Sequence, residues 1–172
     1  LRAVVLGEQE LRELGNQLDE IGTRSVVTWA EYTHEIRAIE ASIRERGETV
    51  AVIDGSTSWD AERIVRAFQN GEISRLVCQP QSCAHGITLT RANYSIFYSL
   101  GFSSELHEQA KRRIYRISQG SRCHHLYLVA PDTIDMAAYR VCLGKKSAAD
   151  AIREAVGVAA GSAAGMVAAQ PA

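Results

Sequence analysis

Short apolar segments alternate with amphipathic segments along most of the chain. Five segments have the nearly continuous apolar character of buried strands: residues 24–30, 49–54, 75–79, 94–99 and 124–130. Apolar residues recur at helical spacing in residues 6–21, 32–46, 58–69, 103–116 and 133–156, the last as one long helix or two short ones. This alternation predicts an α/β fold with three layers, in which a mostly parallel sheet carries helices on both faces.

The same pattern divides the chain into three parts. Residues 1–23 are expected to form an amphipathic lead-in helix, and residues 24–146 the α/β domain. Residues 147–172 are expected to extend a helix and then to end in a flexible tail rich in Ala and Gly. The length of 172 residues is usual for one domain. Because the chain begins at Leu1 rather than Met, we expect it to be a piece of a longer protein.

Composition narrows the possible partners. The net charge is −1, so the domain is no polycation, and any contact with nucleic acid needs a local basic patch. Such a patch is available in Lys111, Arg112, Arg113, Arg116 and Arg122. The weakly apolar run 156–169 is too short to cross a bilayer, and no secretory signal is visible, so we expect no membrane contact and a cytoplasmic location.

Cysteines and histidines give little indication of a metal site. The four cysteines form no C-x-x-C pair, which argues against a structural zinc site and a disulfide framework. A metal set can be imagined from Cys83, His85, Cys123, His124 and His125. The alternation of residues 124–129 favours a strand instead, and we predict no metal site.

The helix predicted at residues 103–116 carries the most informative chemistry. At about 100° per residue, Gln109, Arg113 and Arg116 fall within a narrow arc of one helix face. Two adjacent guanidinium groups repel each other unless they share an anion, and their planar forks suit phosphate oxygens. The pair therefore indicates a polyphosphate clamp, while ordinary solvated surface charge is the simpler alternative.

Loops after three predicted strands are rich in polar residues. Ligands bind at the carboxyl ends of strands in such sheets, so we expect residues 54–58, 79–89 and 99–104 to lie near one another, with the arginines beside them. The first loop enters the helix of Arg63, where Ser and Thr residues indicate either an anion site or simple helix capping. The second loop carries a single glycine, Gly86, and a simple turn is the alternative to a ligand-binding loop there.

Four segments, in this order, resemble the second RecA-like lobe of superfamily-two helicases of the Swi/Snf type, which include phage and bacterial DNA helicases. Residues 55–63 are similar to the family's segment that meets DNA phosphates, and residues 79–89 to its loop ending in G-I-N-L, with Thr88 at the asparagine position. Residues 109–119 are similar to its motif Q-x-x-x-R-x-x-R-x-G-Q, with Ser118 at the glycine position. Residues 133–135 with the lysine pair 145–146 resemble its closing helix. The resemblance covers residues 24–146.

This resemblance implies that the chain is one of the two RecA-like lobes of a helicase motor. The chain has neither G-x-x-x-x-G-K-S/T nor an acidic D-E-x-H-type run, so ATP and Mg²⁺ would be held mainly by an N-terminal RecA-like lobe outside this sequence. Arg113 and Arg116 would act as arginine finger and phosphate sensor in an order left open, Gln109 would orient them or couple them to residues 79–89, and Gly86 would join them at ATP. DNA backbone contacts are implied for Ser56, Thr57, Arg63, Ser82 and Thr88.

The full protein would then be a DNA-dependent ATPase in a bacterial or phage-infected cell, with this piece alone inactive. Two alternatives differ in class. One is a diverged lobe that binds nucleic acid or a partner without supporting hydrolysis. The other is an unrelated enzyme using His85 or the pair His124 and His125 in acid–base chemistry.

Overall fold

A five-stranded parallel sheet forms the centre of the molecule. The computed structural model describes residues 3–83, 86–116, 119–130, 133–144 and 147–153. The strands are β1 (Val26–Trp29), β2 (Val50–Ile53), β3 (Arg75–Cys78), β4 (Tyr94–Phe97) and β5 (His124–Tyr127), in the spatial order β2-β3-β1-β4-β5. Every pairing is parallel. Each strand lies inside one of the five predicted segments, so the sequence prediction of the sheet is confirmed.

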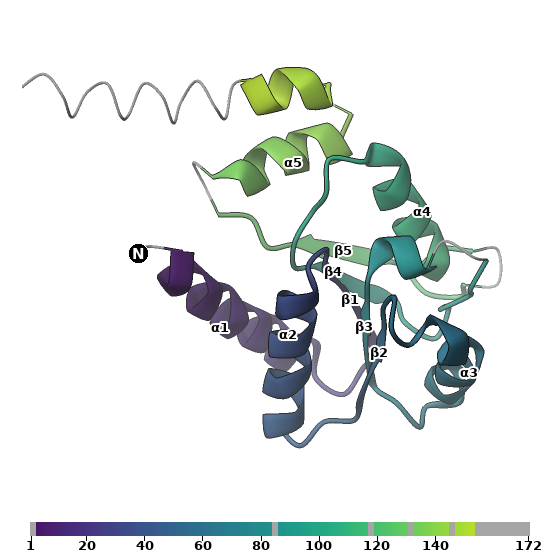
Figure 1. Ribbon diagram of the computed structural model, residues 1–172. Coiled ribbons are helices and arrows are strands. Elements are labelled where there is room, and N and C mark those ends of the chain that lie inside the picture. The colour runs from purple at the N-terminus through teal and green to yellow at the C-terminus, as the bar shows by residue number, and fades with distance from the viewer. Residues whose placement is uncertain (1–2, 84–85, 117–118, 131–132, 145–146, 154–172) are drawn as a thin grey trace, which may run out of the picture.

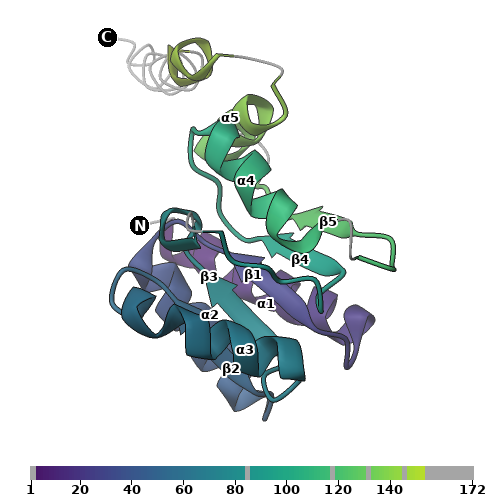
Figure 2. The same ribbon diagram turned by 90° about the vertical axis from the view of Figure 1, so that its right-hand side faces the viewer.

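Helices cover both faces of this sheet. They are α1 (Ala3–Ile21), α2 (Thr33–Glu45), α3 (Ala61–Asn70), α4 (Ser104–Ile114) and α5 (Ile134–Cys142), with short 3₁₀ turns η1 (Ser58–Asp60) and η2 (Pro80–Cys83). Figures 1 and 2 show α1 and α2 on one side of the strands and α3 and α4 on the other. This is the predicted three-layer α/β architecture.

The two faces are built by alternation along each strand. In and just after β1, Val26 and Ala30 pack against the α1 and α2 side, whereas Val27 and Trp29 pack against the α3 and α4 side. All four are fully buried. Burial on both faces explains why β1, β3 and β4 are largely apolar at successive positions instead of alternating with polar residues.

Helix α4 is shorter than its apolar pattern predicts. It begins after Ser103, whose hydroxyl accepts from the Leu106 N–H, and ends at Ile114 because Tyr115 is extended, with φ −93° and ψ 101°. Arg116 therefore lies beyond the helix. The prediction that Gln109, Arg113 and Arg116 share one helix face is wrong for Arg116, because helical spacing says nothing once the backbone leaves the helix.

The segment after β5 is divided into two helical pieces. Helix α5 starts at the cap residue Thr133 and ends before Gly144, which has a positive φ of 66°. Residues 148–153 are helical again. Of the two forms left open by the sequence, the two-piece form is present. Residues 154–172, the predicted tail, lie outside the described residues, and the division at residues 23 and 146 stays a prediction.

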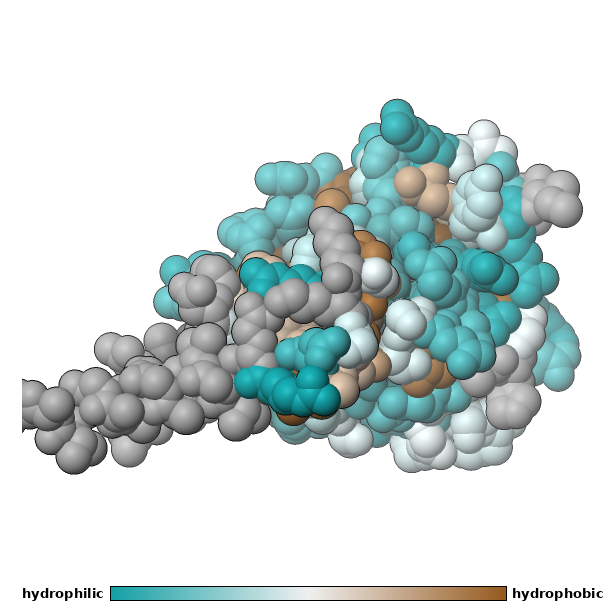
Figure 3. Space-filling model, turned by 90° about the horizontal axis from the view of Figure 1, so that it is seen from above, coloured by the Kyte–Doolittle hydropathy of each residue, from teal (hydrophilic) through white to brown (hydrophobic). Residues whose placement is uncertain are grey.

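The visible surface at the α5 end is mainly hydrophilic, with small separate hydrophobic patches (Figure 3). Exposed apolar side chains in this part of the chain are Ile134, Leu143 and Ile152. Within the described residues, the helices are all too short or too polar to cross a membrane.

Candidate functional site

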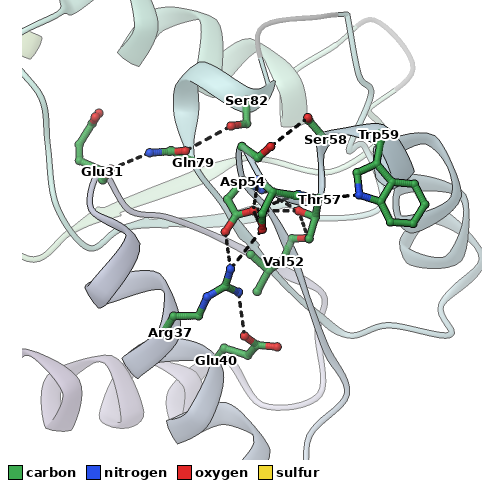
Figure 4. Close-up of polar contacts among 12 residues, drawn as sticks. Glu31, Arg37, Glu40, Val52, Asp54, Thr57, Ser58, Trp59, Gln79 and Ser82 are labelled. Atoms are coloured by element: carbon green, nitrogen blue, oxygen red, sulfur yellow. Dashed lines mark hydrogen bonds and ion pairs between the residues drawn. The ribbon is translucent and has the colours of Figure 1, made fainter.

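The carboxyl end of β2 is organised around one buried carboxylate, that of Asp54. Its side chain is 3% exposed, and its Oδ1 accepts from the backbone N–H groups of Ser56 (2.9 Å) and Thr57 (3.1 Å) and from both their hydroxyls. Its Oδ2 pairs with Arg37 Nη2 at 2.8 Å. Figure 4 shows this cluster between α2 and the turn that leads to α3. Asp54 therefore shapes the loop that the sequence assigned to DNA contact.

The charge of Asp54 is stabilised where it lies. Burial by itself would raise the pKa of this carboxyl. The hydrogen bonds from Ser56 and Thr57 and the charge of Arg37 outweigh burial, so the pKa lies below its usual value of 3.8. Asp54 is thus ionised at neutral pH and acts as a fixed acceptor for the turn.

The hydroxyls predicted to contact DNA are already engaged inside the protein. Ser56 Oγ lies 2.6 Å from Asp54 Oδ1, and Thr57 Oγ1 bonds both the Asp54 N–H and the Val52 carbonyl. Helix capping, the simpler alternative, is absent as well, because the cap residue Asp60 makes no side-chain cap hydrogen bond. Asp60 instead pairs with Arg63, whose side chain is 76% exposed. Arg63 is the predicted DNA residue of this loop that projects furthest into solvent.

Polar side chains also connect the ends of the neighbouring strands β3, β1 and β4. Ser82 donates to Gln79 Oε1 at 3.2 Å, and Gln79 Nε2 donates to the Glu31 carbonyl at 3.0 Å (Figure 4). The Glu31 N–H in turn donates to Ser99 Oγ at 2.8 Å, and Ser99 donates to Glu35. This network holds Ser82 in a fixed orientation at the carboxyl edge of the sheet.

Sequence reasoning did not select the four charged members of these networks as site residues: Glu31, Glu35, Arg37 and Asp54. Two of them carried a usable signal, since Glu31 and Asp54 come within two residues of the end of a buried strand. Arg37 and Glu35 carried no such signal. They lie on α2 among other charged residues, and only the fold brings them into contact with the loops.

The loop after η2 runs from the carboxyl edge back to the end of α4. Gly86 has φ 63°, a conformation that glycine adopts at little cost. Thr88 is half-buried, and the Leu89 N–H donates to the Arg113 carbonyl at 2.8 Å. Residues 84 and 85 of this loop, including the candidate His85, lie outside the described residues. The loop therefore attaches directly to the arginine segment.

The two arginines differ sharply in exposure. Arg113 is 9% exposed, whereas Arg116 is exposed and its Nη2 lies 3.5 Å from the Gly86 carbonyl. Burial, and next the charge of Arg116, lower the pKa of Arg113. Gln109 donates to Glu105 at 3.2 Å, one turn earlier on α4. Arg116 thus lies near both Gly86 and Arg113.

The position of the arginines differs from the prediction. Helix α4 starts after the carboxyl end of β4 and runs back, and just beyond its end Gln119 donates to the carbonyls of Thr90 and Ala92, which precede β4. Figure 2 shows α4 running antiparallel to the strands. The expectation that the arginines lie beside the carboxyl edge is therefore wrong, because a crossover helix carries its last turn to the opposite edge.

Two groups of candidate residues result. Ser56, Thr57, Arg63 and Ser82 lie at the carboxyl ends of β2 and β3, and Gly86, Arg113 and Arg116 lie at the end of α4. The loop of residues 80–90 connects the groups, since Cys83 of η2 is close enough to influence the pKa of Arg113. Such a connection would let one group respond to movement of the other.

The histidine alternative finds little support in the geometry. His124 stacks on Tyr94, with ring centroids 4.8 Å apart, and His125 Nδ1 lies 2.7 Å from the buried Ser95 hydroxyl. Burial, and next the charge of Lys111, lower the pKa of His125 to about 4. Such a histidine stays neutral at neutral pH and is poorly suited to acid–base chemistry there.

This histidine predicts a pH dependence of stability. Between pH 6.5 and about 4 the unfolded chain takes up a proton at His125 that the folded chain does not, so the folded state loses stability as the pH falls through this range. We expect His125→Asn to flatten that decline and to leave the pH dependence of stability above pH 7 unchanged. Urea unfolding at several pH values measures both. An equally steep decline in the variant would contradict the assignment.

Metal ligands do not gather in the described part of the chain. The described residues contain no group of three or more His, Cys, Asp or Glu side chains placed to hold a metal ion. All four cysteines are free thiols.

Comparison with known proteins identifies the family of the chain. The family model described as "Helicase conserved C-terminal domain" matches residues 9–118. The chain belongs to the helicase C-terminal domain family. Its relatives include the Swi/Snf-type protein Helicase domino of Drosophila melanogaster, 29% identical over 145 residues, which cover 83% of this chain and 4% of that protein. Protein p41 of Acyrthosiphon pisum secondary endosymbiont phage 1 is 27% identical over 151 residues, 74% of this chain and 33% of that protein.

Among solved structures, the C-terminal part of the Fun30 ATPase domain has the same fold, with a TM-score of 0.70 at 20% identity over 77% of this chain and 45% of that one. This helicase C-terminal domain thus spans a third or less of the length of these two curated relatives. Its RecA-like fold and its Swi/Snf-type family agree with the resemblance seen in the sequence.

Proposed function

We propose that this domain is the second motor lobe of an ATP-dependent DNA helicase or translocase. The observation that carries the proposal is the meeting of Gly86, Arg113 and Arg116 at the end of α4, because two neighbouring guanidinium groups favour a shared anion. The anion is the triphosphate of ATP, held with Mg²⁺ mainly by an N-terminal RecA-like lobe. Bound ATP supplies the phosphoanhydride bond that is hydrolysed.

The exposure of the two arginines suggests separate roles. Arg116 is exposed and free to reach a phosphate presented by another lobe, so we assign it as the arginine finger. Arg113 is nearly buried against the loop of Cys83 and Leu89, so we assign it as the phosphate sensor that transmits contact to that loop. Gln109 lies one turn before Arg113 on α4 and helps to orient it.

The DNA contacts of this proposal involve the group of residues at the carboxyl ends of β2 and β3. Arg63 offers an exposed guanidinium. The hydroxyls of Ser56 and Thr57 are held by Asp54, and Ser82 by Gln79, so these three residues present a preformed turn rather than free donors. Thr88 is half-buried on the connecting loop. Contacts of this kind position a DNA backbone without reading its sequence.

Activity measurements on two forms of the protein test the two-lobe arrangement. We expect the 172-residue chain to hydrolyse no ATP, since it lacks a phosphate-binding loop, and the full-length protein to show hydrolysis that DNA stimulates. The measurement is phosphate release with and without DNA at several salt concentrations, where affinity for DNA should fall as salt rises. Turnover by the isolated chain would overturn the arrangement.

A diverged lobe that binds nucleic acid or a partner without supporting hydrolysis is the second candidate function. It predicts DNA binding by the full-length protein with no stimulated hydrolysis. The presence of both motif arginines, with Arg116 beside Gly86, favours the motor lobe. The proposed cellular location is the cytoplasm of a bacterial or phage-infected cell.

A further inference from the structure

Strand β5 forms one end of the sheet, and in the described part of the chain it pairs with β4 alone (Figure 2). The backbone N–H groups of His124 and Leu128 donate to carbonyls on the β4 side. Because the backbone groups of successive residues in a strand point to opposite sides, those of His125 and Tyr127 face the open edge. Such an edge is available for pairing with another extended segment.

A groove lies between this end of the sheet and helix α1. Its volume is about 610 Å³, and residues 126–130 line one side of it. The other side consists of Gln9, Glu10, Glu13 and Gln17 of α1. The strand side offers mainly apolar side chains, whereas the helix side offers amides and carboxylates. A ligand of this groove therefore needs both apolar and polar parts.

The helix side of the groove is acidic. Glu10 is partly buried, and burial, followed by the charges of Asp135 and Glu35, raises its pKa. Glu13 accepts from two side-chain amides of its own helix. The ion pairs formed among the described residues involve neither Glu10 nor Glu13. These two carboxylates would be stabilised by a positively charged partner.

The charge of the groove distinguishes between possible occupants. Nucleic acid would bring phosphates close to Glu10 and Glu13, and like charges repel each other. A second copy of the chain, paired edge to edge, would bring a second acidic α1 helix toward the first. An extended polypeptide that carries lysine or arginine suits both sides, since its backbone can bond β5 while alternate side chains reach the carboxylates.

We propose that this groove binds an extended, basic segment of a partner protein, which pairs with β5 as an additional strand and places lysine or arginine side chains against Glu10 and Glu13. The groove shares no residue with the proposed ATP and DNA contacts. The inference therefore adds a protein-docking surface to the domain and does not depend on the proposed function.

Binding of a synthetic peptide to the 172-residue chain tests the role of charge. The probe is a short fluorescein-labelled peptide in which lysine and valine alternate, and binding is measured by fluorescence anisotropy. The groove variant combines Glu10→Gln with Glu13→Gln, which keeps good helix-forming residues in α1. We expect it to bind the peptide about 5- to 30-fold more weakly than the parent, as the loss of two partly exposed ion pairs implies.

A matched control changes two other glutamates of the same helix. The control variant combines Glu8→Gln with Glu20→Gln, which removes the same charge from exposed positions of α1 that do not line the groove. We expect it to bind the peptide as tightly as the parent does. A second peptide, with glutamate in place of lysine, should bind neither form.

Amide hydrogen exchange, followed by NMR, tests the strand pairing itself. The N–H groups of His125 and Tyr127 should exchange more slowly when the lysine peptide is bound, because they gain acceptors at the open edge. The N–H of Leu128 already donates to the Phe97 carbonyl at 2.9 Å, so its exchange should change little.

Each opposite result overturns the proposal. Equal affinity of the parent and the groove variant, or an equal loss in the control variant, refutes the acidic side of the groove as the binding site. Binding without slower exchange at His125 and Tyr127 refutes strand pairing. Protection of these two amides by a DNA duplex, or by self-association of the chain, assigns the edge to another occupant. Failure of the proposed motor function would be seen separately, in the phosphate-release measurement.

Discussion

Arg116→Ala in the full-length protein is expected to lower the rate of ATP hydrolysis by about 10³- to 10⁵-fold and to change the affinity for ATP little. An arginine finger contacts charge that develops on the phosphoryl group in the transition state, so its loss raises the barrier more than it weakens ground-state binding. The exposed side chain of Arg116, beside the Gly86 carbonyl, is available for that contact. Steady-state kcat and the Kd of ATP, measured on the same preparations, check both parts.

The same domain offers a matched control in Arg112→Ala. Arg112 is also an exposed arginine at the end of α4, so its replacement removes the same charge without touching the motif position. We expect it to keep nearly full activity. Arg116→Lys, which retains the charge and loses the planar fork, should recover only part of the rate. Normal turnover by Arg116→Ala would refute the finger assignment.

Asp54→Ala is expected to destabilise the domain by about 2–4 kcal/mol. The buried carboxylate accepts from two backbone N–H groups and two hydroxyls and pairs with Arg37. Alanine would leave these donors without their acceptor. For a domain of this size the thermal midpoint should fall by about 5–12 °C, which calorimetry or thermal circular dichroism measures.

Asp60→Ala is the control for this change, because Asp60 lies in the same loop and pairs with an arginine at the surface. Surface pairs contribute little to stability, so the midpoint should stay nearly unchanged. The pH dependence gives a second check. Since the pKa of Asp54 is lowered, its contribution is fully present above its usual value of 3.8 and is lost as the pH falls below it. Asp54→Asn should lack that acid-dependent loss. A thermal midpoint of Asp54→Ala as high as that of the parent would contradict the role of Asp54.

The sheet and its helices were predictable because burial leaves a direct mark on sequence. The three central strands β3, β1 and β4 are covered on both faces and are therefore largely apolar at successive positions, as at residues 26–27 and 76–78. Helix α2 shows its three buried residues, Ile36, Ile39 and Ile43, at helical spacing. Parallel order followed from the strand–helix alternation, although the spatial order of the strands did not.

The end of α4 was not predictable in the same way. Residues 103–117 keep an apolar helical pattern past Ile114, yet the backbone becomes extended at Tyr115. Beyond this point Gln119 bonds the carbonyls of Thr90 and Ala92, which are close only because the loop before β4 passes the same place. This contact joins segments almost thirty residues apart, so the sequence pattern carries no sign of it.

The candidate site shows a similar division. The types and spacing of Gln109, Arg113 and Arg116 were visible in the sequence and pointed to phosphate chemistry and to the helicase family, to which the chain belongs. Their unequal exposure was not visible, because burial of Arg113 depends on the loop of Leu89 that covers it. The groove between α1 and β5 was equally hidden, because its two sides come from segments far apart in the chain.

The sequence by itself determined the layered α/β architecture and the identity of the chemical groups, since both depend on residue type and on spacing along the chain. The tertiary structure alone decided that Arg37 of α2 pairs with Asp54, and that Arg116 leaves the helix to lie beside Gly86. The reason is physical: hydrogen bonding and burial depend on which distant segments the fold brings within a few ångströms, and spacing along the chain carries no record of that distance.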